Sequence, residues 1–426
     1  MPARLVASWS PGAMVALALL ASCGSSLDSI GCDERTPTPD GGAGLDGGAP
    51  LAPLLGPVSY PNAFKELLGK SDSEIADKIS AAFDQLFHGD PSSEAIYFTT
   101  GTDQAYIRDI YHNDIRTEGI GLGMMITVEL GKRDEFDRLW RFAKSIQTAG
   151  GASQGYFPSF CNTDMNSRPC SDPFGQQQIT TAMLLARGRW QNAPGNIDYQ
   201  QEARDLLDVL RYKEAYNCGI VDDVTGIFDP KSKLAYDTPT TASANISRPS
   251  IAMPAYYELW QQATHDAFWS QTAVAARNYW QASAHKTTGL VPQRATFDGT
   301  PVTGSDTFKP ESYRMFVNMA LDRIWFGGQP WVVDESDRLL RFFYGEGIDT
   351  YGASYTLDGS SELDSSHQGS HIAANGALAS IASIDQRTEF IAAVWNQPLS
   401  TGAPRYYSGI MNMMALLLLG GQMRVY

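Results

Sequence analysis

One stretch of the sequence decides the fold, and from residue 113 to residue 125 it reads Asn113-Asp114-Ile115-Arg116-Thr117-Glu118-Gly119-Ile120-Gly121-Leu122-Gly123-Met124-Met125. Ile120, Met124 and Val128 recur every four residues, which predicts one apolar face of a helix. Thr117 precedes this face at the position of an N-cap. Glu118 then lies at the mouth of the helix, where the glycines that follow leave room beside its carboxylate. Two roles stay open for Glu118 here, an acidic residue of the first turn and a proton donor.

Helical periodicity continues through most of the chain. Ser71 and Glu74 have the spacing of a capping box ahead of an apolar stripe, and strand signals are few and short, such as Gly219-Ile220-Val221. About a dozen helices in one long domain predict an all-α fold whose paired helices close into an (α/α) barrel or toroid. The clearest later stripes are Phe136, Leu139, Trp140, Ala143 and Ile146; Ile179, Ala182, Met183, Ala186 and Trp190; and Phe268, Trp269, Ala273, Ala276 and Trp280.

Composition narrows the class of partner. The 426 residues suffice for one large domain or for two or three ordinary ones, and a hydrophobic content of 43% allows a large core. The net charge of −15 argues against nucleic acid, whose phosphates require a basic face, and favours a neutral or cationic ligand. Nine tryptophans and nineteen tyrosines supply aromatic faces that can stack on sugar rings, although most of them belong to the core.

The N-terminal residues read as an export signal. Residues 1–22 combine Arg4 with an apolar run that is short for a membrane span, and they end in Leu20-Ala21-Ser22-Cys23-Gly24. This ending resembles the bacterial lipobox, in which the cysteine becomes the lipidated first residue, so we expect lipid on Cys23. The alternative is an ordinary signal peptide with a chance cysteine.

The predicted lipoprotein signal determines the domain organisation and the cellular location that we expect. Residues 23–57, rich in Pro, Gly and Ala, then form a flexible tether, and residues 58–426 form one domain. We expect an exported protein anchored to the bacterial cell envelope only through its lipid. Gly24 follows the cysteine in place of an Asp, which favours the outer membrane where the cell has one.

The sequence lacks the motifs of several common kinds of enzyme chemistry. The sequence has no Walker loop, no dinucleotide fingerprint and no HExxH motif. Cys161 and Cys170 bracket a short polar loop and form a possible disulfide, since an exported protein permits one and their spacing is a poor zinc signature. A Ser-His-Asp triad stays open, although no nucleophile elbow occurs. What remains is carboxylates on loops and helix mouths, which is the equipment of glycoside hydrolysis.

Nearly the whole domain resembles glycoside hydrolase family 8, and within it the reducing-end xylose-releasing exo-oligoxylanases. The resemblance runs in order from about residue 60 to the last residue. The segments that carry it are Asn113-Asp114-Ile115-Arg116-Thr117-Glu118-Gly119, Glu135-Phe136-Asp137-Arg138-Leu139-Trp140-Arg141, His285-Lys286-Thr287-Thr288-Gly289-Leu290, Glu311-Ser312-Tyr313-Arg314, Tyr355-Thr356-Leu357-Asp358-Gly359 and Arg405-Tyr406-Tyr407-Ser408-Gly409.

The resemblance implies an (α/α)6 barrel with a substrate cleft across one end, and hydrolysis with inversion. Glu118 is then the general acid and Glu311 the general base, about 6.5–9.5 Å apart so that a water fits between them. No metal or organic cofactor is implied, because two carboxylates and a water suffice. The Pro310-Glu311 pair also has the form of a helix start. The residues expected to contact the sugar are Asp172, Phe160, Tyr313, Arg314 and Tyr407.

The chain departs from the family at several of these positions. Glu311 replaces an Asp, and Phe174 stands where the family has a third Asp that contacts the sugar and sets the charge of the acid. Asp172 lies two residues earlier and can substitute through a loop shift. The loss of the third Asp matters because the helix N-terminus stabilises the ionised form of Glu118, whereas a general acid must carry a proton.

Other differences lie in the sugar-binding floor. Ser159 replaces a Trp, with Phe160 next to it, and Ile251-Ala252 replace a Tyr-His pair. His367 and His371 follow the Tyr355–Gly359 segment, either on a loop that closes the cleft beyond the reducing end or as solvated loop residues.

Two classes of function follow. The first is an inverting hydrolase of β-1,4-linked xylo-oligosaccharides, releasing xylose from the reducing end and acting as a monomer. An endo-acting β-1,4-glucanase, chitosanase or xylanase on the same scaffold is the alternative within this class. The second class is a surface lipoprotein that binds glycans without cutting them, for which Phe174 is the motivating observation.

Overall fold

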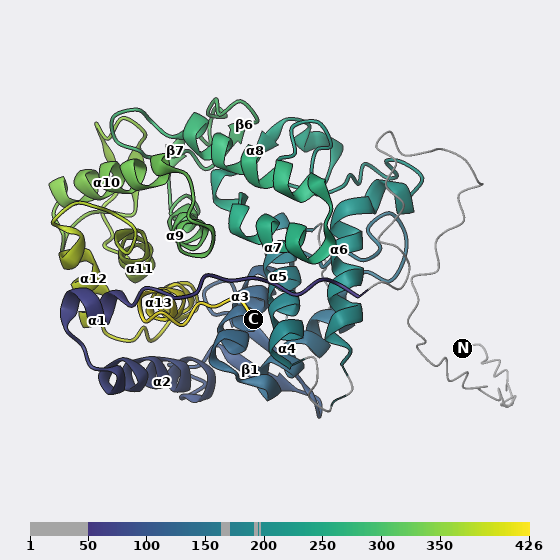
Figure 1. Cartoon of the computed structure of the whole chain (residues 1–426), viewed down its shortest axis with the longest axis horizontal. Coiled ribbons are helices and arrows are strands. Elements are labelled where there is room, and N and C mark those ends of the chain that lie inside the picture. The colour runs from purple at the N-terminus through teal and green to yellow at the C-terminus, as the bar shows by residue number, and fades with distance from the viewer. Residues whose placement is uncertain (1–49, 163–170, 191–194, 196) are drawn as a thin grey trace, which may run out of the picture.

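The computed structural model describes residues 50–162, 171–190, 195 and 197–426, which form thirteen α-helices. Six of them make an inner ring, in which α13 contacts α3 and closes the circle (Figure 1). The inner helices are α3 (Thr117–Leu130), α5 (Pro173–Trp190), α7 (Pro254–Thr264), α9 (Arg314–Phe326), α11 (Gly369–Ala379) and α13 (Arg405–Leu419).

An outer ring covers the inner one. Each outer helix follows an inner helix in the chain and packs against it, except that α2 precedes the ring and packs on α13. The predicted (α/α)6 barrel is therefore confirmed. The outer helices are α2 (Asp72–His88), α4 (Arg133–Ile146), α6 (Tyr199–Tyr216), α8 (Ala267–Ser283), α10 (Pro330–Gly345) and α12 (Arg387–Asn396), and the short α1 (Ala63–Leu68) packs on α12.

The predicted apolar stripes are buried. Outer-ring and inner-ring helices differ in how much of their surface is buried. The capping box of Ser71 and Glu74 is present at the start of α2. Helix α4 buries the predicted stripe and exposes its charged side, which is the pattern of an outer helix. Helix α3 is instead buried on every side because it lies between α4, α5 and α13.

The start of α3 differs from the prediction in two respects. Thr117 is the first helical residue and not the N-cap, a position that Arg116 holds without a side-chain hydrogen bond. The Thr117 N–H and hydroxyl both donate to the neighbouring segment, to the carbonyls of Ser159 and Pro158. This segment therefore satisfies the helix end that a capping side chain would otherwise serve.

The glycines of the opening stretch do not leave open space beside Glu118. A Cβ atom on Gly119 would lie 2.9 Å from the ring of Tyr406, and one on Gly121 would lie 2.6 Å from the Cβ of Gln178. These contacts come from α13 and α5. The prediction was wrong because side chains of the neighbouring helices occupy the space that the missing glycine side chains leave.

Small antiparallel sheets that the sequence did not signal connect the helices. Gly219-Ile220-Val221 is not among their strands, and Val221 forms only an isolated bridge to Val224. The sheets are β1-β2-β3-β4 (Tyr97–Thr100, Gln104–Asp109, Asp114–Arg116, Phe160–Asn162), β5-β6 (Ile246–Ser247, Ala295–Thr296) and β7-β8-β9 (Thr307–Phe308, Ser354–Thr356, Glu362–Asp364), and the 3-10 turns are η1 (Thr241–Ser243) and η2 (Pro249–Ile251). Strand β3 runs directly into α3 and so places Glu118 at the end of the barrel.

The folded domain begins before the predicted boundary at residue 58. Leu51 and Leu54 are buried, and the Arg187 guanidinium donates to the carbonyls of Leu51 and Ala52 at 2.6 and 2.7 Å. The Ala52 N–H donates to the carbonyl of Ala263. In Figure 1 this dark segment crosses the molecule near the C-terminus. The predicted signal peptide, Cys23 and most of the tether lie outside the described residues, and no helix in the described part is both long and apolar enough to cross a membrane.

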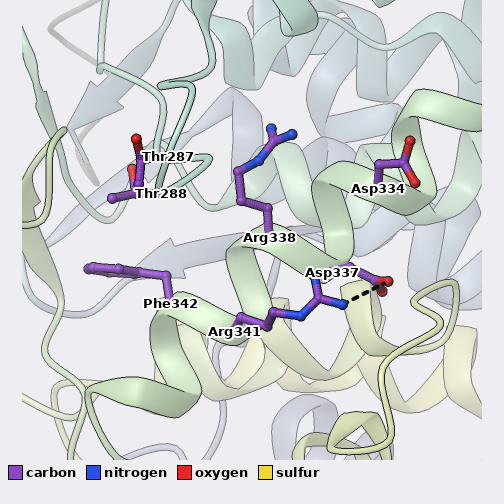
Figure 2. A pocket seen from close by; sticks show the side chains of 7 residues that line it. All are labelled: Thr287, Thr288, Asp334, Asp337, Arg338, Arg341 and Phe342. Carbon is purple, nitrogen blue, oxygen red and sulfur yellow. Dashed lines mark ion pairs between the residues drawn. The ribbon is translucent and has the colours of Figure 1, made fainter.

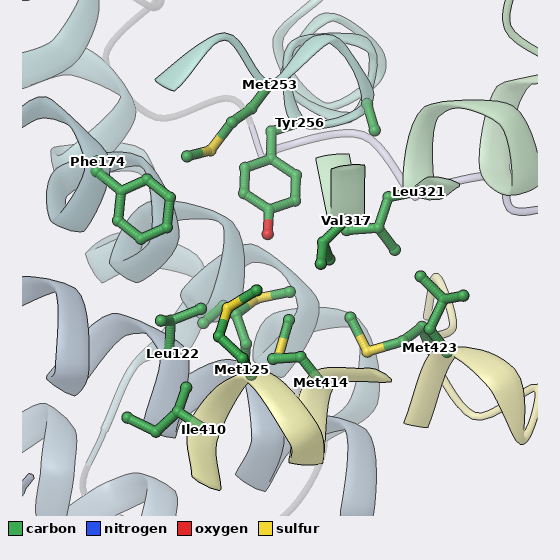
Figure 3. Packing of buried hydrophobic residues seen from close by; sticks show 14 of the residues in the cluster. Leu122, Met125, Phe174, Met253, Tyr256, Val317, Leu321, Ile410, Met414 and Met423 are labelled. Atoms are coloured by element: carbon green, nitrogen blue, oxygen red, sulfur yellow. The ribbon is translucent and has the colours of Figure 1, made fainter. Parts of the chain in front are cut away.

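The interior of the barrel is filled by side chains and not by a channel. Figure 3 shows Leu122, Met125, Phe174, Tyr256 and Met414 packed across the ring from different helices. The cavity among them measures about 10 Å³, which is the space of a single water. A substrate can therefore be held only at an end of the barrel.

Candidate active site

The first turns of the inner helices meet at one end of the barrel, which we call the rim. Inner and outer helices alternate along the chain, so the inner helices all point the same way. The predicted site residues are consequently neighbours although they lie far apart in sequence. Those on first turns are Glu118 on α3, Phe174 on α5, Arg314 on α9, His371 on α11, and Tyr406 and Tyr407 on α13.

Glu118 is held by two of these neighbours. Its Oε2 lies 2.9 Å from Nη1 of Arg314, and its Oε1 accepts a hydrogen bond of 3.1 Å from the Tyr406 hydroxyl. Its side chain is 13% exposed, so the carboxylate is largely withdrawn from water but still reachable from the rim. The structure thus gives Tyr406, which was not predicted as a site residue, a direct contact with the predicted acid.

Arg314 also connects Glu118 to the segment of Glu311. Its Nε donates to the Tyr407 hydroxyl at 2.9 Å, and that hydroxyl donates to the carbonyl of Pro310 at 3.0 Å. Glu311 itself is half-buried on a turn, and α9 begins only at Arg314, so the predicted helix start at Glu311 was wrong.

The pKa of the Arg314 guanidinium reflects its charged neighbours. Burial lowers this pKa, but Glu118, Tyr407 and Glu311 act in the opposite direction and hold it well above its usual value. Glu118 is paired with Arg314 directly, and the segment of Glu311 is joined to it through Tyr407 and Pro310.

Asp172 does not take the place of the missing third carboxylate. Its Oδ1 lies 2.5 Å from Nη2 of Arg248, and its Oδ2 accepts from the N–H of Gly175 at 3.3 Å. The side chain therefore caps α5 and pairs with an arginine that the sequence did not single out. The prediction that Asp172 substitutes beside Glu118 is not supported, because its carboxylate is engaged by these two groups.

The remaining predicted contacts divide between the rim and the core. Phe174 is buried and its ring lies 4.8 Å from the Arg314 guanidinium, so an aromatic ring supports the arginine where the resemblance expects an acid. Phe160 is half-buried and pairs in register with Arg116 on β3, two residues before Glu118. Tyr313 has no exposed surface, and its hydroxyl lies 2.7 Å from that of Ser370. It therefore does not take the predicted place in the sugar-binding floor.

The two histidines are not solvated loop residues. His371 is fully buried on α11, where its ring stacks on that of Tyr313 at 4.6 Å. Burial lowers the pKa of His371 to about 3, so it is neutral at physiological pH. His367 is half-buried, and its Nδ1 lies 2.8 Å from the carbonyl of Tyr351. Both rings therefore support the rim from the side of α11.

A hollow of about 590 Å³ lies elsewhere on the described surface. It follows the outer helix α10, and Figure 2 shows Arg341 directed toward Asp337, with Arg338 and Phe342 nearby. Both of its arginines are paired, since Arg341 lies 3.6 Å from Asp337 and Arg338 pairs with the buried Glu335. We therefore assign the chemistry to the rim, where Glu118 is held by Arg314 and Tyr406.

The predicted disulfide and possible metal ligands concern cysteine and acidic side chains. Cys170, the proposed partner of Cys161, lies outside the described residues, and Cys218 is disulfide-bonded. Among the residues that the structure describes, no group of three or more His, Cys, Asp and Glu side chains has the arrangement of a metal site.

Comparison with known proteins decides the family. Residues 97–421 match the sequence profile described as Glycosyl hydrolases family 8. The chain belongs to glycoside hydrolase family 8. Members of this family that resemble it include the reducing-end xylose-releasing exo-oligoxylanase Rex8A of Paenibacillus barcinonensis, 32% identical over 379 residues, with 86% of this chain and 97% of Rex8A covered.

Other family 8 proteins agree with this assignment. A reducing end xylose-releasing exo-oligoxylanase of Halalkalibacterium halodurans is 31% identical, with 86% of this chain and 94% of that protein covered. Among solved structures, a family 8 xylobiose complex from Teredinibacter turnerae superposes with a TM-score of 0.80 at 32% identity, covering 86% of this chain and 98% of that one. The likeness thus extends over the whole barrel.

Two residues of the site were missed or undervalued by sequence reasoning. Tyr406 was visible as part of a tyrosine pair, but nothing showed that its hydroxyl reaches Glu118. Arg248 carried no signal, because it lies in an irregular segment before Pro249 and meets Asp172, 76 residues away, only in the folded chain.

Proposed function

We propose that this family 8 protein hydrolyses β-1,4-linked xylo-oligosaccharides with inversion and releases xylose from the reducing end. The observation that carries the proposal is the position of Glu118, held at the rim by Arg314 and Tyr406, with the segment of Glu311 joined to the same arginine through Tyr407 and Pro310. The two exo-oligoxylanases named above, from Paenibacillus barcinonensis and Halalkalibacterium halodurans, supply the substrate class and the exo mode.

In the proposed reaction the glycosidic bond lies between the two carboxyl groups. Glu118 donates its proton to the bridging oxygen, which leaves with both electrons of the bond to the anomeric carbon. Glu311 takes a proton from a water that attacks the same carbon from the opposite face. The products are two shorter sugars, and the new anomeric hydroxyl has the opposite configuration to the bond that was cut.

The proposal is tested by product analysis on residues 50–426, which include the packed segment around Leu51. Xylotriose should yield xylose and xylobiose, and proton NMR at early times should show the inverted anomer at the new reducing end, which is that of xylobiose. Glu118→Gln should lower kcat by about 100-fold or more, because Gln cannot donate the proton. Glu202→Gln, on the outer helix α6 beside Lys144, is the matched control and should match the parent.

Cello- and chito-oligosaccharides distinguish the alternatives. Faster cleavage of either at internal bonds would replace the exo-oligoxylanase assignment by an endo-acting enzyme on the same scaffold. The second candidate, a glycan-binding protein without hydrolytic activity, is favoured by one observation, the buried ring of Phe174 against Arg314 where the family has an acid. Binding of xylotriose with no product from any substrate would establish it.

We further propose that Cys23 carries lipid and anchors a monomeric enzyme to the cell envelope. The support is the lipobox-like sequence and the path of the described N-terminal segment. That segment contacts Arg187 in the last turn of α5 and Ala263 near the end of α7, so it joins the barrel at the end opposite the rim. An anchored barrel would then expose its rim. Cys23→Ala should move the protein from the membrane fraction to the soluble fraction, and unchanged membrane association would contradict the anchor.

A further inference from the structure

Phe174 lies at the start of an inner helix, next to the segment that carries the predicted general acid. It is the second residue of α5 and 3% exposed, and its ring is turned into the barrel (Figure 3). A ring this withdrawn from water cannot stack on a sugar held at the rim. Its role therefore follows from the groups that it contacts inside the protein.

The start of α5 is packed closely on the start of α3. A Cβ atom on Gly175 would lie 2.8 Å from the carbonyl carbon of Thr117 and 2.9 Å from the backbone nitrogen of Glu118, so only a glycine permits this approach. The Gly175 N–H also donates to Asp172 at 3.3 Å. The backbone thus holds Phe174 beside the turn that carries Glu118.

From this position the Phe174 ring contacts the guanidinium of Arg314 on α9. The ring centre lies 4.8 Å from the guanidinium carbon, and the centre of a second ring, that of Tyr407 on α13, lies 5.2 Å from it. Both distances are within the range of cation–π attraction, which strengthens where water is excluded. Because the Arg314 side chain is 9% exposed, both rings act on a largely desolvated cation.

The two rings are neutral and leave the charge of Arg314 to Glu118. Nη1 of the guanidinium lies 2.9 Å from Oε2 of Glu118, and its Nε donates to the Tyr407 hydroxyl at 2.9 Å. A carboxylate in place of the Phe174 ring would compete for the guanidinium, whereas a ring supports it without forming an ion pair. The position of the guanidinium, and with it that of the Glu118 carboxyl group, therefore depends on how firmly the rings hold it.

We propose that Phe174 is a positioning residue for Glu118 and acts through Arg314. Its ring fixes the guanidinium, and the guanidinium fixes the carboxyl group that gives its proton to the glycosidic oxygen. A small displacement of a reacting group slows the chemical step more than it weakens substrate binding. The inference rests on the proposed function and adds to it a residue that does not touch the substrate.

The experiment measures kcat and KM for xylotriose in variants of the protein. Phe174→Leu keeps an apolar side chain but removes the ring, and should lower kcat about tenfold with little change in KM. Phe174→Tyr retains the ring and should recover most of the lost kcat. Should Phe174→Leu fail to fold, Phe174→Met, whose flexible side chain refills the space, carries the same prediction.

Phe268 provides a matched control. Its ring, 6% exposed on the outer helix α8, lies 4.1 Å from the Arg211 guanidinium, and Arg211 pairs with Asp266 at 2.8 Å. The same arrangement of ring, arginine and carboxylate thus occurs at the start of an outer helix, at the end of the barrel opposite the rim. Phe268→Leu should lower stability in urea as Phe174→Leu does and leave kcat unchanged. Equal losses of kcat in the two variants would overturn the proposal, because loss of packing would then explain both.

A double-mutant cycle tests whether the effect passes through Arg314. If it does, Phe174→Leu should lower kcat much less in an Arg314→Gln background than in the parent, because the guanidinium that the ring supports is already gone. Losses of kcat that simply multiply in the double variant would overturn the proposal.

A further readout does not depend on activity. NMR of arginine side chains, with the Arg314 Nε–H assigned through Arg314→Gln, reports the mobility of this guanidinium. Its order parameter should fall in Phe174→Leu and stay unchanged in Phe174→Tyr and Phe268→Leu. If no variant hydrolyses any sugar but Arg314 becomes mobile in this pattern, the proposed function fails and the positioning role of Phe174 stands. If hydrolysis occurs and folded Phe174→Leu keeps both the kcat of the parent and a rigid Arg314, the positioning role is overturned.

Discussion

Helix α3 carries Glu118 at the rim and a second glutamate, Glu129, near its other end. Glu129 is 4% exposed, and its Oε2 accepts hydrogen bonds of 3.0 Å from the Arg424 N–H and from the Tyr426 hydroxyl. Its Oε1 is buried without a hydrogen-bond partner. Burial, only partly opposed by these bonds and by Arg189 and Arg424, raises the pKa of Glu129 from 4.5 to about 8. We predict that Glu129→Gln removes a pH-dependent loss of stability.

The sign and the size follow from linkage. A carboxyl group whose pKa is raised in the folded state holds its proton more tightly there, so its stability contribution is complete below pH 4.5 and is lost as the pH rises toward 8. Between pH 5 and pH 8 the loss amounts to about 3.5 kcal/mol, at about 1.4 kcal/mol per pKa unit. Glutamine is close in shape to the protonated glutamate and does not titrate.

The assay is urea unfolding of the parent and Glu129→Gln at pH 5 and at pH 8. The two proteins should differ little in unfolding free energy at pH 5, and the variant should gain about 3–4 kcal/mol relative to the parent by pH 8. Glu202→Gln on α6 is the control and should have the same unfolding free energy as the parent at both pH values. The reasoning is refuted if the difference between Glu129→Gln and the parent is the same at pH 5 and pH 8.

Two further predictions concern the packing and hydrogen bonding of the rim. Gly121→Ala should lower the unfolding free energy by about 1–3 kcal/mol in a urea titration, because the added Cβ would lie 2.6 Å from that of Gln178, whereas Gly150→Ala meets nothing within 4 Å and should be neutral. Equal stability of the two variants would contradict the close approach of α3 and α5. Tyr406→Phe should lower kcat/KM for xylotriose about tenfold or more, since a hydrogen bond to a carboxylate contributes about 1.5–3 kcal/mol. Tyr344→Phe, which loses a similar bond to a surface glutamate, should leave kcat/KM unchanged, and equal effects of the two would argue against a role for Tyr406 at the site.

Much of the fold could be predicted because it depends on local periodicity. The stripes of Phe136 to Ile146 and the capping box at Ser71 encode helices through contacts within a few residues, and the structure has helices there. Short strands escaped prediction because β3, for example, has only three residues and is defined by its partners β2 and β4. The pairing of a three-residue strand comes from its neighbours and leaves no periodic pattern.

The candidate site was predictable in part. The segments around Glu118 and Glu311 resemble those of a known family, and the structure pairs Glu118 with Arg314 and joins the segment of Glu311 to the same arginine through Tyr407. The structure pairs Asp172 with Arg248, for a physical reason. A carboxylate pairs with the nearest cation, and Arg248 lies 76 positions away in the sequence, where no local pattern could connect the two.

The sequence by itself determined that this protein is an all-α barrel of family 8 and that Glu118 begins an inner helix. These properties depend on helical periodicity and on short motifs, which a linear chain carries directly. The tertiary structure alone decided what surrounds Glu118, namely the arginine of α9, the tyrosine of α13 and the absence of space beside its glycines. Electrostatic and packing energies depend on distances through space, and these distances exist only after six helix ends have met at one rim.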